Sequence, residues 1–257
     1  MRPDLLILTV YFICLFYVLY QMAKDVEDAI DPKVKIWLDS QLLKDSVEQQ
    51  LDQQERDDID VSVPEGGGPS GLVLNFLDLS DEAERPLGAI KLQVMPQGMQ
   101  TINPISALSV EIVNQMPYTQ VAIDWDNSSL TLLSDQARRV VRHIPGLMTT
   151  LGQPQVHTVV NPSQRVSAMV TSEDAFGRNP ETQALQPVTP LINLERVIMM
   201  PFLQPPSYSL MLLVSIYPMA APQRQPIQLL VPFKFYIEEL EEQPALPLFR
   251  WLLRFSR

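Results

Sequence analysis

The sequence predicts a mainly β protein: an antiparallel β-sandwich preceded by an N-terminal transmembrane helix and an acidic helical stalk. Three observations support this fold class. A long uncharged apolar run lies near the start of the chain, and a strongly acidic segment follows it. From residue 72 onward, short β-forming runs are separated by proline, asparagine and serine, with no amphipathic helices between them. With 46% apolar residues among 257, the chain is long enough to bury a core.

The transmembrane prediction rests on Leu5 to Met22, LLILTVYFICLFYVLYQM, in which no residue is charged. As a helix this run is about 27 Å long, close to the ~30 Å hydrocarbon thickness of a bilayer. A cleaved signal peptide is the alternative, but no small-x-small cleavage site follows, and Tyr17 and Tyr20 suit the membrane interface. We therefore expect an uncleaved signal-anchor over residues 1–22.

Basic residues on the two sides of this span predict its orientation. Arg2 precedes it, whereas Lys24, Lys33 and Lys35 follow, so the positive-inside rule favours a body on the cytoplasmic face by a small margin. The single cysteine, Cys14, lies in the apolar run, which excludes an intrachain disulfide and a cysteine-based zinc site. A content of 22 Gln and 6 Lys is typical of a cyanobacterial membrane protein, which would place the chain in a thylakoid or plasma membrane.

Net charge is concentrated beside the span. Residues 23–85 contain 6 Lys and Arg against 17 Asp and Glu, whereas residues 86–257 contain 12 of each. An acidic surface repels a phosphate backbone, so the composition argues against nucleic-acid binding. The expected partners are the lipid bilayer and another protein of a membrane complex.

The acidic segment 23–62 is predicted to form a helical stalk. Asp31-Pro32 suits a helix start, and a helix over about 32–55 is expected from the helical spacing of Val34, Leu38, Leu42, Leu43, Val47 and Leu51. Such a helix either packs on its own domain, stays solvated, or pairs with a partner as a short coiled coil. The stretch VPEGGGPSG, residues 63–71, is predicted to be a flexible linker between stalk and body, and it lacks the Lys-Ser or Lys-Thr of a phosphate-binding loop.

The body, residues 72–240, is predicted to contain nine strands. Many of these runs alternate apolar and polar residues with period two, and Pro218 and Pro232 are expected at strand ends, edges or bulges. The predicted strands are 72–79, 89–95, 107–113, 118–125, 138–144, 155–160, 165–171, 208–217 and 227–237.

The last residues, 244–257, are predicted to form a short basic amphipathic helix. One helical face contains Arg250, Arg254 and Arg257, and the other contains Trp251 and Phe255. This helix either covers the sandwich or contacts anionic lipid or a protein partner.

The stretch AIDWDNSSL, residues 122–130, raises the question of catalysis. An apolar strand that runs into Asp-x-Asp resembles the start of haloacid-dehalogenase-type phosphatases, which implies Asp124 as nucleophile and Asp126 as acid/base. Such an enzyme also needs a lysine, a later acidic pair for Mg²⁺ and a parallel α/β sheet. The only lysine after Lys91 is Lys234, and the pair Glu173-Asp174 follows too soon. Phosphatase activity is therefore the third-ranked hypothesis.

Structural and metal-binding interpretations of the same stretch remain. A Ca²⁺ ion held by Asp124, Asp126 and Asn127 would need further oxygen ligands, and the serines miss the spacing of a metal-ion-dependent adhesion site. We instead expect Trp125 to pack in the core and residues 126–129 to form a capped turn into a new strand at Leu130. The two histidines, His143 and His157, have no second ligand at a fixed spacing. No catalytic residue, cofactor or metal is therefore predicted.

The stretch VEIVNQMPYTQVAIDWDNSSL contains a strand, an asparagine near a proline turn and a second strand. Across residues 105–171 it resembles the late-embryogenesis-abundant type 2 (LEA-2) and water-stress (WHy) domains, in which a strand ends in an Asn-Pro turn. Here two residues separate Asn114 from Pro117. The resemblance implies an immunoglobulin-like or LEA-2-like sandwich behind a single membrane anchor, without catalytic residues.

The leading functional hypothesis is a non-enzymatic, single-span membrane protein that acts in protein-protein interaction, as a subunit or assembly factor of a membrane complex. The alternative is a lipid-binding or small apolar ligand-binding protein, in which Met199, Met200 and Phe202 would line a groove.

Overall fold

The computed structural model describes residues 3–28, 33–64, 69–78, 85–133, 136–143, 153–178, 185–200, 205–219 and 225–240. The chain divides into two compact units, which are described separately. The first comprises Met1–Lys33 with Glu239–Arg257, and the second, the body, comprises Val34–Glu238. The predicted C-terminal helix over 244–257 lies outside the described residues.

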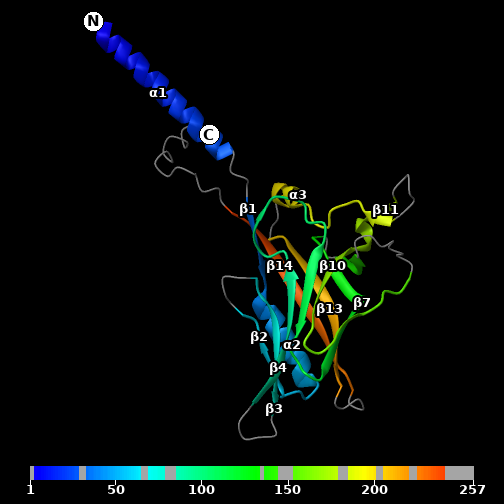
Figure 1. Cartoon of the computed structure of the whole chain (residues 1–257). Helices are drawn as coiled ribbons and strands as arrows, with labels where there is room; N and C mark the ends of the chain where they lie inside the picture. The colour runs from blue at the N-terminus through cyan, green and yellow to red at the C-terminus, as the bar shows by residue number, and fades with distance from the viewer. Residues whose placement is uncertain are drawn as a thin grey trace. The chain divides into compact units, whose positions relative to one another are not determined.

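The first unit contains the helix α1 (Pro3–Asp28) (Figure 1). Its side chains are described at 8–19, 21 and 22, and every side chain from 8 to 19 is exposed. One polar pair lies on its surface, where Gln21 Nε2 donates to the Tyr17 hydroxyl at 2.9 Å. Within the described part of the chain, no helix combines the length and the apolar character that crossing a membrane requires.

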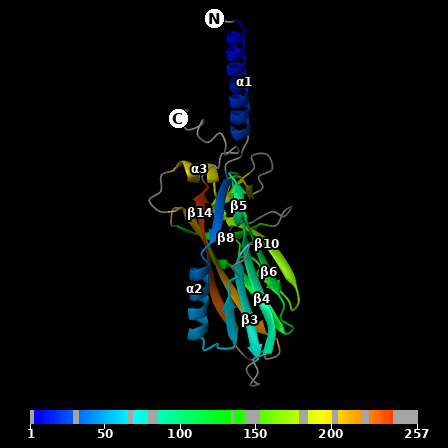
Figure 2. The same cartoon turned by 90° about the vertical axis from the view of Figure 1, so that its left-hand side faces the viewer.

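The body is a single curled antiparallel sheet, which confirms the mainly β prediction (Figures 1 and 2). The strand order is β2-β3-β4-β6-β10-β8-β7-β13-β14-β1-β5, with β9 also paired to β7; β11 and β12 form a separate hairpin. The strands are β1 (Lys33–Leu38), β2 (Ile59–Ser62), β3 (Gly71–Asp78), β4 (Arg85–Met95), β5 (Gly98–Thr101), β6 (Leu108–Asn114), β7 (Thr119–Thr131), β8 (Ala137–His143), β9 (Thr158–Val160), β10 (Arg165–Ser172), β11 (Phe176–Arg178), β12 (Leu185–Pro187), β13 (Ser207–Pro218) and β14 (Ile227–Glu239). All nine predicted strands are present, and eight of them begin and end within four residues of their expected bounds; the ninth, predicted at 118–125, continues as β7 to Thr131.

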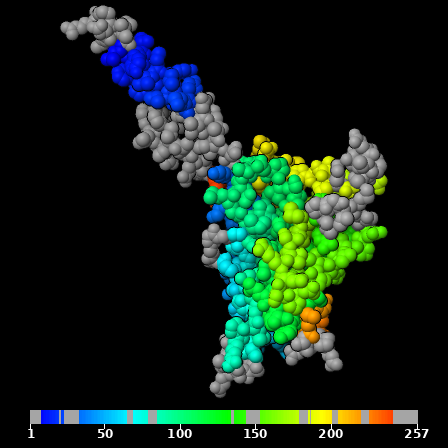
Figure 3. Space-filling model, viewed as in Figure 1, coloured from blue at the N-terminus to red at the C-terminus, as the bar shows by residue number. Residues whose placement is uncertain are grey.

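Within the described residues of the body, three helical segments accompany the sheet: α2 (Ser40–Gln53), the 3₁₀ turn η1 (Glu173–Ala175) and α3 (Leu194–Met199). In the space-filling view, β4, β6 and β10 lie side by side on the surface turned to the reader, in agreement with their pairing (Figure 3). The inward side chains of the strands form one core, whose largest fully buried members include Trp125, Tyr208, Phe233 and Phe235.

The predicted helix over 32–55 is wrong in its first part, because residues Lys33–Leu38 form the strand β1. The sequence KVKIWL alternates, so Val34, Ile36 and Leu38 are buried while Trp37 and the lysines face outward. The four-residue spacing of Val34, Leu38 and Leu42 fits both the period of a strand and that of a helix, which explains the error. The helix α2 starts later, with Asp39 as N-cap: its Oδ1 accepts from Leu42 N at 3.0 Å.

The stalk prediction for 23–62 is wrong from Val34 onward, because these residues belong to the body. Leu43, Val47 and Leu51 of α2 are buried in the same core as the strands, so the alternative in which the helix packs on its own domain is confirmed. In Figure 2, α2 lies beside β14 and β3. The boundary expected at 63–71 therefore does not separate two folded units.

Helix α2 also satisfies backbone groups of β14. Gln50 Nε2 donates to Leu230 O at 2.8 Å, and Gln50 Oε1 accepts from Leu230 N at 2.7 Å. One helix turn later, Gln54 Nε2 donates to Gln228 O at 2.8 Å. Main-chain groups of every second residue of β14, at 228, 230 and 232, point towards α2. Proline has no N–H group, so at Pro232 the strand has no donor on this side that needs a partner, which is consistent with the predicted edge position.

Replacement of Gln50 by leucine removes both hydrogen bonds to Leu230 and leaves its backbone groups unpaired. At ~1 kcal/mol for each lost bond, we expect the free energy of unfolding to fall by about 2 kcal/mol. Gln49→Leu, at an exposed position of the same helix, is the matched control. Denaturant unfolding of the full chain, followed by circular dichroism, measures both variants; equal stabilities would contradict the proposed role of Gln50.

Tyr208 on β13 places a polar hydroxyl group in the apolar core. Its side chain is 2% exposed and stacks on Phe235 with ring centroids 5.0 Å apart, and its hydroxyl has no hydrogen-bond partner among the described residues. Burial raises the pKa of the Tyr208 phenol above its ordinary value of 10.0. An unsatisfied buried hydroxyl destabilises a fold by roughly 1–3 kcal/mol.

We expect Tyr208→Phe to raise the free energy of unfolding by about 1 kcal/mol near neutral pH, because the unsatisfied hydroxyl is removed. The unfolded tyrosine ionises at lower pH than the folded one, so stability is full below pH 10.0 and is lost as the pH rises above that value. The Tyr208→Phe variant has no phenol to ionise at this position, so its free energy of unfolding should fall less than that of wild type above pH 10. Unfolding curves at pH 7 and above pH 10 measure both effects; a less stable variant at pH 7 would show that the hydroxyl has a partner.

Candidate functional site

The polar cluster predicted around Asp124 lies on a bulge in β7. On the neighbouring strand β13, Leu213 pairs with Asp124 and Met211 with Ser129, so Leu212 alone faces the four residues 125–128. The predicted turn into a new strand is therefore wrong in one respect. The chain makes a local turn but continues as the same strand in the same sheet.

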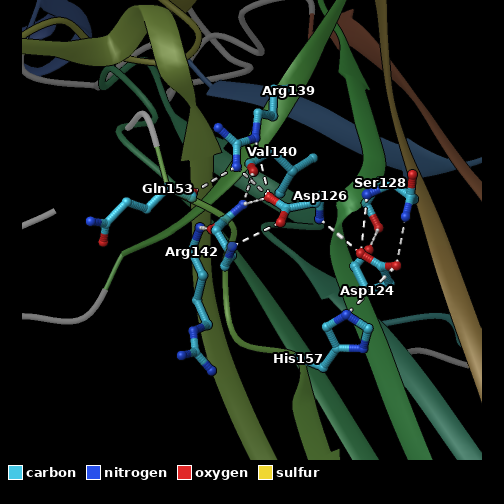
Figure 4. Close-up of polar contacts among 10 residues, drawn as sticks. Asp124, Asp126, Ser128, Arg139, Val140, Arg142, Gln153 and His157 are labelled. Carbon is cyan, nitrogen blue, oxygen red and sulfur yellow. Dashed lines mark hydrogen bonds and ion pairs between the residues drawn. The ribbon is translucent and has the colours of Figure 1, made fainter. Parts of the chain in front are cut away.

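Asp124 organises this bulge, as Figure 4 shows. Its Oδ1 accepts from the backbone N–H groups of Asp126 at 3.0 Å and Asn127 at 3.1 Å, and its Oδ2 accepts from Asn127 Nδ2 at 2.7 Å. The Ser128 hydroxyl donates to Asp124 O and accepts from Leu213 N at 3.1 Å. The expected side-chain-capped turn is thus present, with Asp124 and not Asp126 as the capping residue.

Trp125 packs in the core, as predicted, and is fully buried. Its indole Nε1 donates to Thr158 Oγ1 at 2.9 Å, so the polar edge of the ring is satisfied. A guanidinium nitrogen of Arg142, on β8, donates to the same hydroxyl at 2.8 Å. The bulge is thereby joined to β8 and β9.

Asp126 is the second carboxylate of the cluster. It accepts from the guanidinium of Arg139, from Gln155 N at 2.8 Å and from Gln155 Nε2 at 3.2 Å. Burial alone raises the pKa of Asp126, but the hydrogen bonds from Arg139 and Gln155, with the charge of Arg139, outweigh burial and hold that pKa below its ordinary value. This carboxylate is therefore an anion held by a cation.

His157 lies beside Asp124, with its Nε2 3.7 Å from Asp124 Oδ2. Burial raises the pKa of Asp124, whereas the hydrogen bonds from Asn127, the charge of His157 and the Asp126 backbone together lower it below its ordinary value. Because the His157 side chain is 52% exposed, this pair is open to solvent and contributes little to stability.

The chemical roles implied by the phosphatase resemblance do not fit this geometry. The sheet is antiparallel, Asp126 is engaged with Arg139, and Asp174 of the expected acidic pair forms an ion pair with Arg138. Across the described segments, no three His, Cys, Asp or Glu side chains are grouped so as to hold a metal ion. The cluster instead fastens the loop before β9 to β7 and β8.

Two buried or half-buried amides complete this fastening. Gln155 Oε1 accepts from Arg142 N and Gln155 Nε2 donates to Val140 O, both at 2.7 Å, so this side chain pairs with β8 as a strand would. Asn114, the residue of the LEA-2 resemblance, is 1% exposed. Its Nδ2 donates to Thr119 O at 2.7 Å and to the carbonyl oxygens of Val160 and Asn161, and its Oδ1 accepts from Met116 N.

The other residues considered from the sequence do not join the cluster. Arg250, Trp251, Arg254, Phe255 and Arg257 lie outside the described residues, as does Phe202. Met199 and Met200 of the expected apolar groove are 82% and 42% exposed.

The structure shows one surface feature that sequence reasoning missed. Trp37 on β1 is 40% exposed and stacks on Tyr236 of β14, with ring centroids 4.6 Å apart. The ammonium group of Lys234 lies 5.1 Å from the centre of the Tyr236 ring. Alternation in KVKIWL is the signal that could have revealed it, because it places Trp37 on the same face as two lysines.

Comparison with known proteins adds no relative: no protein-family model, no curated protein and no solved structure matches this chain.

Asp126→Asn tests the fastening role. The neutral amide loses the ionic part of its bonds to Arg139, and we expect the free energy of unfolding at pH 7 to fall by about 2 kcal/mol. Because the folded pKa lies below the ordinary 3.8, the carboxylate contributes stability above that pH and loses it as the pH falls through the folded value. The variant should therefore lose less stability than wild type below pH 4.

Glu48→Gln, which affects the exposed pair with Lys44 on α2, serves as the control. Unfolding curves measured between pH 2 and 7 compare the three proteins. Identical acid profiles for wild type and Asp126→Asn would contradict a fastening role for the carboxylate.

Proposed function

We propose that the protein is a single-span membrane protein whose β body binds another protein, as a subunit or assembly factor of a membrane complex. The single observation on which this rests is the surface of α1. From residue 8 to 19 its side chains are exposed and nearly all apolar, including Phe12, Ile13 and Phe16 at 46%, 63% and 61%. Apolar exposure around a whole helix is unfavourable in water and favourable in lipid.

The uncharged run Leu5–Met22 supports the same proposal. It lies within α1, whose helical bounds are Pro3–Asp28, and a helix of about 20 apolar residues suffices to cross a bilayer. Basic residues after the run support a body on the cytoplasmic face. The content of 22 Gln and 6 Lys supports a thylakoid or plasma membrane as its location. The curled sheet with its single core is compatible with a sandwich-like body behind such an anchor.

The protein-binding part of the proposal is supported by the body surface. Trp37, which is 40% exposed, stacks on the half-buried Tyr236 on a sheet face, and exposed aromatic residues are enriched where proteins meet. The polar cluster around Asp126, in contrast, has its hydrogen-bonding groups engaged within the fold.

Ile13→Arg tests the anchor. A charged side chain at the centre of a span costs about 3 kcal/mol, so we expect the variant to shift from the membrane pellet to the supernatant after alkaline carbonate washing. Gln21→Arg is the control, because a long side chain near the end of a span reaches the interface. Wild-type protein that carbonate releases completely would refute the anchor.

The native complex tests the second part. Membranes expressing the tagged full chain are solubilised in mild detergent and separated on a native gel. We expect a discrete band well above the mass of the 29.1 kDa chain, with its components identified by mass spectrometry. Migration as a monomer would refute the subunit proposal and favour the lipid-binding or ligand-binding alternative.

A further inference from the structure

The edge of β10 that faces β8 is only partly covered. Asn114 lies opposite Gln164 in the register of β6 and β10, and Asn114 N donates to Gln164 O at 2.9 Å. Every second residue from Gln164 onward therefore bonds to β6, and the main-chain groups of Arg165 and Ser167 point to the other side. On that side β8 pairs with residues 169–172. Within the described residues, Arg165 and Ser167 thus present N–H and C=O groups to no strand.

Strand β9, which precedes β10 in the chain, does not fill this edge. It pairs with β7, through residues 158–160, and not with β10. The loop between the two strands is closed by a hydrogen bond from Gln164 N to Asn161 O. The boundary between residues 158–160 and 165–167 is here called the β9–β10 seam. Main-chain pairing between neighbouring strands is interrupted there.

Arg142 brings a positive charge to this seam. It lies opposite the buried Val170 in the register of β8 and β10, so its side chain leaves β8 on the inner side of the sheet. Its Nη1 donates to Thr158 Oγ1 on β9 at 2.8 Å. The side chain is half-buried, and it extends away from Asp126 (Figure 4). The guanidinium therefore reaches from β8 to β9.

Arg142 has no carboxylate partner among the described residues, whereas the other arginines of β8 and β10 have one each. The pairs are Arg138 with Asp174, Arg139 with Asp126, and Arg165 with Glu111.

The nearby carboxylate of Asp124 does not take this role. It accepts from Asn127 and lies beside His157. The hydrogen bond to Thr158 uses one N–H group of Arg142, and a guanidinium has several. A half-buried cation without a counter-ion is unfavourable, and a carboxylate can bond to two N–H groups of a guanidinium at once. Charge complementarity at the seam therefore favours a carboxylate ligand.

We propose that the β9–β10 seam binds an extended acidic segment of a partner protein, whose main chain adds a strand to β10 at Arg165 and Ser167 and whose carboxylate side chain bonds to Arg142. This inference rests on the proposed protein-binding function and adds the site and the chemistry of the partner. A peptide fits this site better than a free anion, because only a peptide has donors and acceptors at the spacing that a strand edge requires. Main-chain pairing contributes affinity, and Arg142 selects the acidic residue.

The first test changes Arg142 in the full chain. Arg142→Gln should weaken the complex by about tenfold or more, measured by the amount that survives dilution on a native gel. Arg196→Gln, at an exposed position of α3, is the control. Thr158→Val removes the internal acceptor of Arg142 but keeps the guanidinium, so it should leave the complex intact. If Thr158→Val weakens the complex as much as Arg142→Gln does, Arg142 has a structural role only and the proposal is wrong.

The second test changes the edge of β10. Ser167→Pro removes an N–H group that points away from β6 and should weaken the complex by about fivefold or more. Ser167→Ala is the matched control, because both variants lose the hydroxyl contact with Ser109 but alanine keeps the N–H group. Denaturant unfolding of each variant shows whether the body still folds. Equal complex yields for the two variants would exclude strand addition at this edge.

Chemical modification tests the site without relying on a loss of binding. Phenylglyoxal reacts with accessible guanidinium groups, and mass spectrometry maps the products. We expect Arg142 to be protected in the native complex and to react in the full chain released from it, whereas Arg196 reacts in both. In Arg142→Lys, which keeps the charge, a carbodiimide should join the new amine to a carboxylate of the partner and so identify the bound segment.

The outcomes separate the two proposals. A native complex that persists in Arg142→Gln and Ser167→Pro would overturn the binding site and leave the subunit function standing; absence of any complex in wild type would overturn both. Carbodiimide links from position 142 to a carboxylate of this same chain would overturn the proposed partner. Protection of Arg142 by inorganic phosphate, together with a complex that Ser167→Pro does not affect, would indicate a phosphate site in place of a peptide site.

Discussion

The fold depends on satisfying backbone hydrogen-bonding groups where its curled sheet leaves strands without neighbours. Three glutamine side chains do this, each presenting both a donor and an acceptor to main-chain groups: Gln50 to Leu230, Gln97 to Ser70, and Gln155 to Val140 and Arg142. A primary amide has the same donor and acceptor groups as a peptide unit, so it can replace a missing strand over one residue. A buried peptide group left without a partner costs roughly 1–3 kcal/mol, which is more than the ~1 kcal/mol that one hydrogen bond contributes net.

The bulge in β7 is a second consequence of the same constraint. Before it, β7 pairs with β9, and after it residues 129–131 pair with β8. Where β7 and β8 are not paired, the loop before β9 fills the gap with Gln155, which bonds to Asp126, Val140 and Arg142. The cluster contains the residue types of an active site, yet each carboxylate already accepts hydrogen bonds from several donors. The same chemistry that suggested catalysis in the sequence is used here to hold three strands together.

How much of this was predictable depends on the distance over which each interaction acts. The nine strands were predictable because alternation is local, and Trp125 was correctly placed in the core for the same reason. Strand β1 was missed because Val34, Leu38 and Leu42 satisfy two periodicities, and the continuation of β7 was missed because Asp-Asn-Ser-Ser favours a turn when neighbouring strands are unknown. The contact of Gln50 with Leu230 joins residues 180 positions apart, and no local pattern indicates it.

The edge formed by Leu230 and Pro232 limits how a second molecule can approach this part of β14. The N–H and C=O groups of Leu230 are both bonded to Gln50, and Pro232 has no N–H group. A strand added at this edge would therefore find no continuous row of free main-chain groups to pair with. A molecule that approached this part of β14 would therefore meet its side chains and not a row of free main-chain groups. A surface of that kind discriminates between sequences residue by residue, and single substitutions can retune its specificity while the main chain stays unchanged.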